Sequence, residues 1–317
     1  MEIVHTPVLL EEVIRFLGPR RQGELMIDAT LGEGGHSHAF LSRFPDLQVI
    51  GIDADRDIQD VAKERLREFG SRIVFYTGWS QDFFASPPVD NRRPDTILID
   101  LGVSLYHYRK GNRGFSFMRD EALDMRIDRT GGVSAADLIA GLSERELADL
   151  LYINGEERYS RRIARSIKEA KTQGKITGSG GLAELVVRAV PVAYRYGPVH
   201  PATKTFQALR IAVNRELEGL PALLEAALEA LKPGGRMGVI SFHSLEDRIV
   251  KNFFRERGKN TLEEPIHKKG GRGIINLLSR KGISPGMDEI RNNPSSRSAR
   301  LRVVEKNVHE YRLKDGQ

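Results

Sequence analysis

A cluster of glycines after a short apolar run constrains the fold of this chain most strongly. In the segment IDATLGEGGHS, residues 27–37, three glycines fall within four positions. Because glycine has no Cβ, such a turn lets the backbone approach a ligand closely. No Gly-Lys-Ser/Thr follows at the spacing of a P-loop, and the match to the dinucleotide pattern G-x-G-x-x-G is loose. The turn therefore predicts a phosphate, a dinucleotide or a nucleoside at the end of a strand.

Strand-like and helix-like patterns alternate around this turn. The strand-like segments are short and apolar, at 23–32, 47–57, 72–80 and 94–104. Helical spacing fills the segments after the first two strands and also precedes the first strand, where Thr6 is a candidate cap and Gly18 a stop. The alternation predicts βαβ units, and hence a parallel sheet with helices on both faces.

The pattern changes in the middle of the chain and then returns. From about residue 120 to residue 201 the apolar spacing is helical, which predicts an inserted helical domain. Two more helices, a strand at 236–244 and a further helix follow. The segment 258–300, rich in Lys, Arg, Gly, Asn and Ser, is typical of a long polar loop, and the alternation at 299–306 predicts a last edge strand.

Charge and composition narrow the function classes. The formal net charge is +6 and the sequence pI about 9.5, which favours a polyanionic partner such as nucleic acid, although a solvated basic surface gives the same balance. With no cysteine, disulfides, thiolate metal sites and cysteine nucleophiles are excluded. The chain has no signal-peptide pattern and no run of 18 apolar residues, so we expect a cytoplasmic protein without a membrane span.

Acidic and aromatic residues follow the predicted strands, at the end where an open α/β sheet binds ligands. Asp53 ends the second strand, where an acid accepts hydrogen bonds from a ribose, and Asp100 ends the fourth. Trp79, after the third strand, offers a flat surface to an adenine. This order suits a nicotinamide dinucleotide or S-adenosylmethionine, and it fits the second better. Each acid by itself also suits a helix cap or a solvated strand end.

Several longer strings are more specific than these features. They are HTPVLLEEV (5–13), DATLGEGGHS (28–37), DLGVS (100–104), RGFSFMRDEALDMRID (113–128), HPATKTFQALRIAVNREL (200–217), KPGGRMGVISFHSLEDRIVK (232–251) and NPSSRSARLR (293–302). Together they cover nearly the whole chain. The sequence resembles the family of bacterial small-subunit ribosomal RNA methyltransferases that modify the N4 amine of a cytidine in the decoding centre.

The resemblance implies an α/β fold, namely a class I methyltransferase Rossmann-like sheet with an inserted all-helical domain, and S-adenosyl-L-methionine as methyl donor. It implies a methyltransferase domain at 1–112 and 202–317 and a helical domain for substrate recognition at 113–201. Carried over position by position, the family's cofactor contacts fall on Gly34, Gly35, His36, Asp53, Trp79, Asp100 and His107.

Two of these positions depart from the family pattern. The family usually has Phe where this chain has Trp79, a change that keeps a flat aromatic surface. It has Gln where this chain has His107, inside a loop, LYHYRKGN at 105–112, that differs from the family. A neutral imidazole nitrogen either donates or accepts, so it replaces only part of what an amide does.

Two residues are candidates for catalysis of methyl transfer to an exocyclic amine. The amine lone pair is delocalised into the cytosine ring, so the enzyme must accept hydrogen bonds from the amine and aim its nitrogen at the methyl carbon. Asp100 is the first candidate acceptor, with cofactor binding as an alternative or additional role. His243, in SFHSLEDR at 241–248, is the second, with a structural role as its alternative. No motif such as H-E-x-x-H occurs, so no catalytic metal is expected.

Four residues are candidates for RNA contact. Phe115 and Phe117 suit stacking on a base moved out of the RNA helix, or alternatively packing of the insertion against the sheet. Arg272 and Arg297 lie in basic segments that suit phosphate contact, or alternatively a solvated charged loop.

The leading hypothesis is S-adenosylmethionine-dependent methylation of the N4 amine of a cytidine in the decoding region of small-subunit ribosomal RNA. The expected partner is that RNA or the assembled small subunit, with no membrane, and the expected protein is a monomer or homodimer. Three alternatives stay open at this point. They are a methyltransferase of the same fold acting on DNA or protein, a non-catalytic ribosome-assembly factor that keeps the cofactor for stability, and a nicotinamide dehydrogenase.

Overall fold

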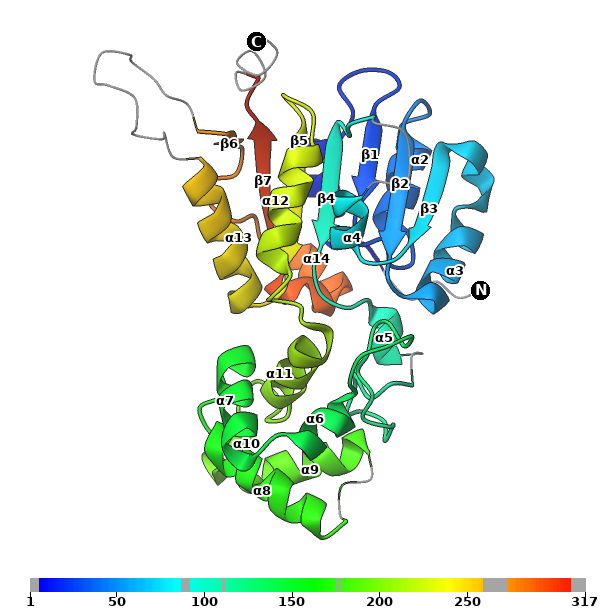
Figure 1. The fold of residues 1–317 in the computed structure, drawn as a ribbon. Helices are drawn as coiled ribbons and strands as arrows, with labels where there is room; N and C mark the ends of the chain where they lie inside the picture. Colours follow the sequence, from blue (N-terminus) through cyan, green and yellow to red (C-terminus); the bar gives the residue numbers. More distant parts are fainter. Residues whose placement is uncertain are drawn as a thin grey trace, which may run out of the picture. The chain divides into compact units, whose positions relative to one another are not determined.

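A computed structural model describes residues 6–86, 92–109, 112–174, 176, 178–258 and 273–308 (Figure 1). The chain divides into two compact units. The sheet unit combines Met1–Gly102 with Leu217–Gln317, and the helical unit is Val103–Glu216. The helical unit therefore includes residues on both sides of the 113–201 segment expected from the sequence.

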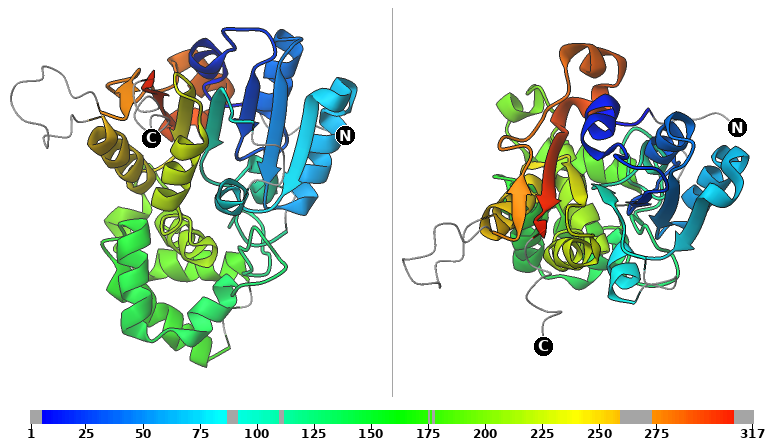
Figure 2. Two further views of the ribbon diagram at one scale, coloured as in Figure 1. Left: turned by 45° about the horizontal axis from the view of Figure 1, so that its top comes forward. Right: turned by 90° about the horizontal axis from the view of Figure 1, so that it is seen from above.

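The sheet unit is built on a seven-stranded sheet in the order β3-β2-β1-β4-β5-β7-β6 (Figure 2). The strands are β1 Leu25–Asp28, β2 Gln48–Asp53, β3 Ile73–Thr77, β4 Thr96–Asp100, β5 Arg236–Ser241, β6 Ile275–Leu277 and β7 Arg300–Lys306. The pairs among β1 to β5 are parallel, and β7 is antiparallel to both β5 and β6. This is the strand order of the class I methyltransferase fold, so the expected Rossmann-like α/β sheet is confirmed.

Helices cover both faces of this sheet because successive side chains of a strand point to opposite faces. Ile27 and Ile97 face a core shared with α4 Ser80–Ala85, α12 Leu220–Ala230 and α13 Ser244–Arg257. Met26 and Leu98 face a core shared with α1 Leu10–Leu17, α2 Gly35–Arg43 and α3 Arg56–Arg65. Strands buried on both faces read as continuous apolar runs, which is why they were visible in the sequence.

The prediction of an edge strand at 299–306 is wrong. β7 lies between β5 and β6, and β6 is the strand at that edge of the sheet, within the segment predicted to be a polar loop. Arg300 of β7 is exposed, but Arg302 and Lys306 are buried with partners. Arg302 donates to both carboxylate oxygens of Asp247 at 2.8 and 3.0 Å, and the Lys306 ammonium donates to three carbonyl oxygens of the α12 region at 2.8 to 3.0 Å. Side chains that resemble a solvated face are here satisfied inside the protein.

The first helix also differs from its prediction. α1 begins at Leu10 after Leu9, which has a left-handed φ of 55°, so Thr6 is not its cap. Glu289 of α14 (Met287–Asn292) accepts a hydrogen bond from the Leu9 amide at 2.7 Å, so a residue distant in sequence supplies the acceptor. The expected stop is confirmed, since Gly18 follows the last helical residue and its amide donates to Ile14 O. Two short 3-10 helices complete the unit, at Arg67–Arg72 and Pro294–Ser298.

The described part of the helical unit consists of helices joined by loops. The helices are α5 Leu105–Arg109, α6 Ala135–Gly141, α7 Glu144–Gly155, α8 Ser160–Thr172, α9 Ser179–Ala189, α10 Val192–Arg195 and α11 Thr203–Asn214. Capping boxes at Ser134 and Ser143 begin α6 and α7. Apolar side chains from α6 to α9 and α11 form one core, which includes Leu151, Ile163 and Leu209.

Candidate active site at the carboxyl ends of the strands

Acidic residues gather where three parallel strands of the sheet unit end. Asp28, Asp53 and Asp100 are the last residues of β1, β2 and β4. Parallel strands end at the same edge of the sheet, so their terminal carboxylates share one side of the molecule. Asp53 and Asp100 were predicted from the sequence. Asp28 was not, although it ends its strand in the same way.

The glycine turn after β1 is held by its own packing. Gly32 and Gly34 have left-handed φ values of 54° and 73°, which favour glycine. A Cβ added at Gly34 would lie 2.9 Å from Leu66 Cδ1, and one at Gly35 would lie 2.7 Å from Pro7 Cγ. In this structure, therefore, these glycines leave room for the protein's own side chains.

Asp53 ties the turn to the second strand. One carboxylate oxygen accepts from the Gly32 amide at 2.8 Å, and the other accepts from the Asp55 amide at 2.9 Å. The two backbone amides fix the orientation of this carboxylate. Asp55 in turn accepts from the Asp57 amide and caps α3.

His36 lies at the start of α2 and connects the turn to Asp100. It is buried, and its Nε2 lies 3.0 Å from Val8 O, an acceptor that requires the proton on Nε2. Its Nδ1 lies 3.7 Å from Asp100 Oδ2. The ring therefore bridges the N-terminal segment and the end of β4.

A hydrogen bond fixes the backbone of Asp100, and its carboxyl group is largely buried. Its amide donates to Thr30 Oγ1 at 2.6 Å. Burial, with the nearby charges of Asp28 and Glu246, raises the pKa of Asp100 well above its ordinary value. Among the described residues, its Oδ1 is buried without a hydrogen-bond partner. An acceptor oxygen left in that state is suited to a donor that arrives with a ligand.

Asp28 is the most deeply buried of the three acids. Its side chain accepts from Ser37 Oγ at 2.7 Å. Burial raises the pKa of Asp28 to about 6, against the lowering effect of the Ser37 hydroxyl. Neighbouring carboxyl groups with raised pKa values make this end of the sheet a candidate functional site.

His243 caps the start of α13, two residues after the end of β5. Its Nδ1 accepts from the Glu246 amide at 3.4 Å, and its Nε2 lies 3.1 Å from Glu246 Oε1. Glu246 is buried, and its other oxygen accepts from the Phe242 amide at 2.8 Å. The ring is thus oriented by the first turn of its own helix. Glu246 was not among the predicted site residues, although its charge contributes to raising the pKa of Asp100.

Trp79 follows β3 and immediately precedes α4, at the same edge of the sheet as the three acids. It is half-buried. The next residue, Ser80, donates its hydroxyl hydrogen to Ala29 O, which ties the start of α4 to the glycine turn. The backbone on either side of Trp79 is therefore fixed.

Three further candidates belong to the helical unit. His107 is buried in α5, with its ring centroid 5.2 Å from that of Phe115. Phe115 is only 3% exposed and lies in the core of the unit, which agrees with packing rather than with stacking on a base. Phe117 is partly buried and stacks on His200 at 4.5 Å and 21°. The sequence analysis did not single out His200.

The two arginine candidates stand in different positions. Arg297 is exposed in the 3-10 helix Pro294–Ser298, which ends just before β7. Arg272 lies outside the described residues. Among the described helices, none is both long and apolar enough to cross a membrane.

Comparisons with known proteins identify relatives along nearly the whole chain. Ribosomal RNA small subunit methyltransferase H of Treponema denticola is 55% identical over 309 residues, which are 96% of this chain and 98% of that protein. The protein of the same name from Treponema pallidum is 42% identical over 96% of this chain and 93% of its own. Among solved structures, a putative methyltransferase from Streptococcus mutans in complex with SAH shares 12% identity over 94% of each chain, with a TM-score of 0.40, a likeness too weak to carry an argument.

A family-level match agrees with the site. The sequence profile of the MraW methylase family matches residues 2–307, a span that contains the glycine turn, all three strand-end acids and the whole helical unit. With that match and relatives above 40% identity, this chain belongs to the MraW methylase family.

Proposed function

We propose that this protein transfers a methyl group from S-adenosyl-L-methionine to the N4 amine of a cytidine in the decoding region of small-subunit ribosomal RNA. The observation that carries the proposal is the buried Asp100 carboxyl group, whose Oδ1 has no hydrogen-bond partner among the described residues. Membership of a methylase family and the names of the relatives supply the reaction class and the RNA. Such a substrate implies action in the cytoplasm.

The strand-end acids suit this cofactor. S-adenosylmethionine supplies an electrophilic methyl group on a sulfonium, and its amino group is a second cation. The charges of Asp28 and Glu246 both act on Asp100, so a cation beside Asp100 would relieve that repulsion. Asp53, with both oxygens oriented by backbone amides, would accept from the ribose hydroxyls. Trp79 would face the adenine, and Gly34, Gly35 and His36 would shape the turn beside the cofactor.

Asp100 is our proposed acceptor for the target amine. An amine that donates a hydrogen bond to a carboxylate keeps its lone pair directed away from that bond, which favours a nucleophilic pyramidal nitrogen. After transfer the nitrogen carries an additional positive charge and must lose a proton. A carboxylate whose pKa is raised by burial is a better proton acceptor than a solvated aspartate.

The remaining candidates are proposed contacts to the cofactor or the RNA. We assign His243 to the target base or its phosphate, and His107 to the position where the family's Gln contacts the cofactor. Phe117 with His200 offers an aromatic pair for a base, while burial directs Phe115 to the core. Arg297, exposed beside β7, and Arg272 are proposed phosphate contacts.

The test is methyl transfer from labelled S-adenosylmethionine to small ribosomal subunits prepared from a strain that lacks the enzyme, followed by nucleoside analysis. Naked small-subunit RNA is assayed in parallel, because the two substrates distinguish recognition of an assembled particle from recognition of sequence alone. We expect labelled N4-methylcytidine, and its loss in Asp100→Ala. Cofactor binding without transfer to either substrate would contradict the proposal and support an assembly factor instead.

A further inference from the structure

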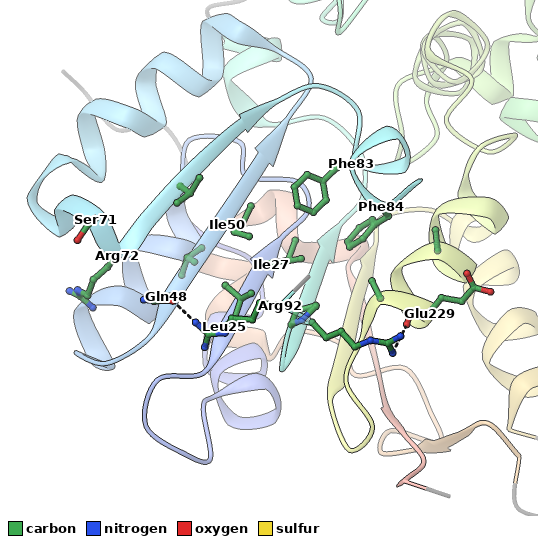
Figure 3. Close-up of a pocket in the computed structure, with 16 residues that line it drawn as sticks. Leu25, Ile27, Gln48, Ile50, Ser71, Arg72, Phe83, Phe84, Arg92 and Glu229 are labelled. Carbon is green, nitrogen blue, oxygen red and sulfur yellow. Dashed lines mark hydrogen bonds between the residues drawn. The ribbon is translucent and has the colours of Figure 1, made fainter. Parts of the chain in front are cut away.

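A cavity lies toward the opposite edge of the same sheet. It has a volume of about 550 Å³ and is lined near the amino ends of β1, β2 and β3 (Figure 3). Leu25 begins β1, Gln48 begins β2, and Arg72 directly precedes β3. The proposed transfer site lies at the carboxyl ends of these strands, so the cavity is separate from it. Its volume is within the range of about 300–1,000 Å³ that holds small-molecule ligands.

The floor and walls of this cavity are apolar. Ile27 and Ile50 present their side chains from the sheet, and the rings of Phe83 and Phe84 from α4 stand at one end (Figure 3). Val74 on β3 lines the cavity and is 46% exposed. α4 has only six residues, and α12 presents the small side chains of Ala226 and Ala230, so neither helix covers this part of the sheet.

Arginines stand at the rim. Arg72 donates to the carbonyl oxygens of Leu41 and Phe44 at 3.0 and 3.1 Å, and Arg92 donates to Gln48 Oε1 at 2.6 Å. These acceptors are neutral, and among the described residues no ion pair is formed by Arg72 or Arg92. Arg93 also lines the cavity, and Glu229 is the only acidic residue among the described residues that line it, so this part of the lining carries a positive balance.

We propose that this cavity binds an amphipathic anion, namely a medium-chain fatty acid whose carboxylate meets the arginine rim while its chain covers the apolar floor. A guanidinium presents a fork of donors that matches a carboxylate, and apolar walls with few polar groups are typical of ligand pockets. Arg92 would supply the head-group contact and Ile50, Val74 and Phe83 the chain contact. Val74, which is 46% exposed, would thereby be removed from water.

The test is calorimetric titration of the full-length protein with dodecanoate below its micelle concentration. Acetate, dodecanol and dodecyl phosphate serve as probes of the head and the chain. We expect one saturable site for dodecanoate, at least about tenfold weaker binding of dodecanol, and no binding of acetate. Tighter binding of dodecyl phosphate than of dodecanoate would assign the site to phosphate amphiphiles and overturn the carboxylate. Equal binding of dodecanol and dodecanoate would reduce the site to non-specific adsorption.

Substitutions at the rim and inside the cavity test whether dodecanoate binds there. Arg92→Ala removes an exposed rim cation, and Ala226→Leu fills the cavity with a residue that favours helix, so both are expected to fold. We expect each to weaken dodecanoate binding by about tenfold or more. Arg67→Ala, at an arginine that does not line the cavity and whose side chain is 81% exposed, is the matched control and should bind as the native protein does.

Two results would overturn the proposal. The first is unchanged binding in Ala226→Leu with a native circular dichroism spectrum. The second is competition between dodecanoate and S-adenosylhomocysteine, which would place the fatty acid at the carboxyl edge. Dodecanoate binding that is unaffected by saturating S-adenosylhomocysteine is the expected outcome.

Discussion

The two edges of one sheet carry opposite chemistry. At the carboxyl edge, Asp28 and Asp100 are buried carboxyl groups with raised pKa values. At the amino edge, Arg72 and Arg92 stand at the rim of an apolar cavity. The first edge suits cations and proton transfer, and its charge varies with pH. The second suits anions. The strands are shared, so the difference comes from the residues that begin and end them.

The largest expected effect is on the carboxyl edge. Asp100→Asn keeps the size of the side chain and removes its charge and one acceptor oxygen. We expect the rate of methyl transfer to fall by about 100-fold or more, the range seen when a single preorganised polar group is removed from a transition state. Labelled transfer to small subunits measures the rate. Asp60→Asn, at an aspartate whose side chain is 72% exposed, is the control and should keep native activity. Native activity in Asp100→Asn would remove Asp100 from the catalytic role.

The same carboxyl group predicts a pH profile. Asp100 must be ionised to accept from the amine, and burial with the charges of Asp28 and Glu246 raises its pKa. Transfer should therefore decline as the pH falls, beginning at a higher pH than an ordinary aspartate would give, with a limiting slope of about tenfold per pH unit. Single-turnover rates across pH measure this. The residual activity of Asp100→Asn should lack that decline, and a decline that persists would point to another group.

Asp28 predicts an effect on stability. Its folded-state pKa of about 6 lies above the ordinary 3.8, so its ionised form disfavours the folded state. Its favourable contribution is complete below pH 3.8 and is lost as the pH rises to about 6. Asp28→Asn, which keeps an acceptor for Ser37, should gain on the order of 3 kcal/mol relative to the native protein between pH 4 and pH 8. Urea unfolding at both values measures the gain. Asp60→Asn should show none, and an equal shift in both variants would contradict this reading.

The sequence predicts those features that follow from local patterns along the chain. The order of strands and helices, the glycine turn, and the acids Asp53 and Asp100 follow from apolar runs and from the residues directly after them. It fails where a side chain takes its partner from far along the chain. Arg302 and Lys306 read as an exposed alternation but are buried against Asp247 and the α12 carbonyls. Asp28 and Glu246 acquire their significance from the charges around them, which no local pattern records.

The glycine turn offers a sharper test of the carboxyl edge. Gly35→Ala would place a Cβ 2.7 Å from Pro7 Cγ, and we expect a loss of about 1–3 kcal/mol in stability from this overpacking. If packing is the reason for the glycine, Pro7→Ala should restore most of that loss in the double variant. A double-mutant cycle by urea unfolding measures the coupling. Additive losses in the double variant would show that the strain does not come from contact with Pro7. Recovered stability without recovered cofactor binding would show that Gly35 is needed for both packing and cofactor binding.

The smallest expected effect is on the free energy of unfolding, for a variant in the cavity at the amino edge of the sheet. Val74 is 46% exposed, so Val74→Thr should change the free energy of unfolding by about 0.5 kcal/mol or less, while Ile50→Thr, at a residue 8% exposed on the same cavity floor, should lose several times more. Urea unfolding of both variants measures this. A large loss in Val74→Thr would mean that the folded protein itself needs an apolar residue there. The small loss expected would show that folding does not require an apolar side chain at position 74. Weaker dodecanoate binding in Val74→Thr would then show that ligand binding requires it.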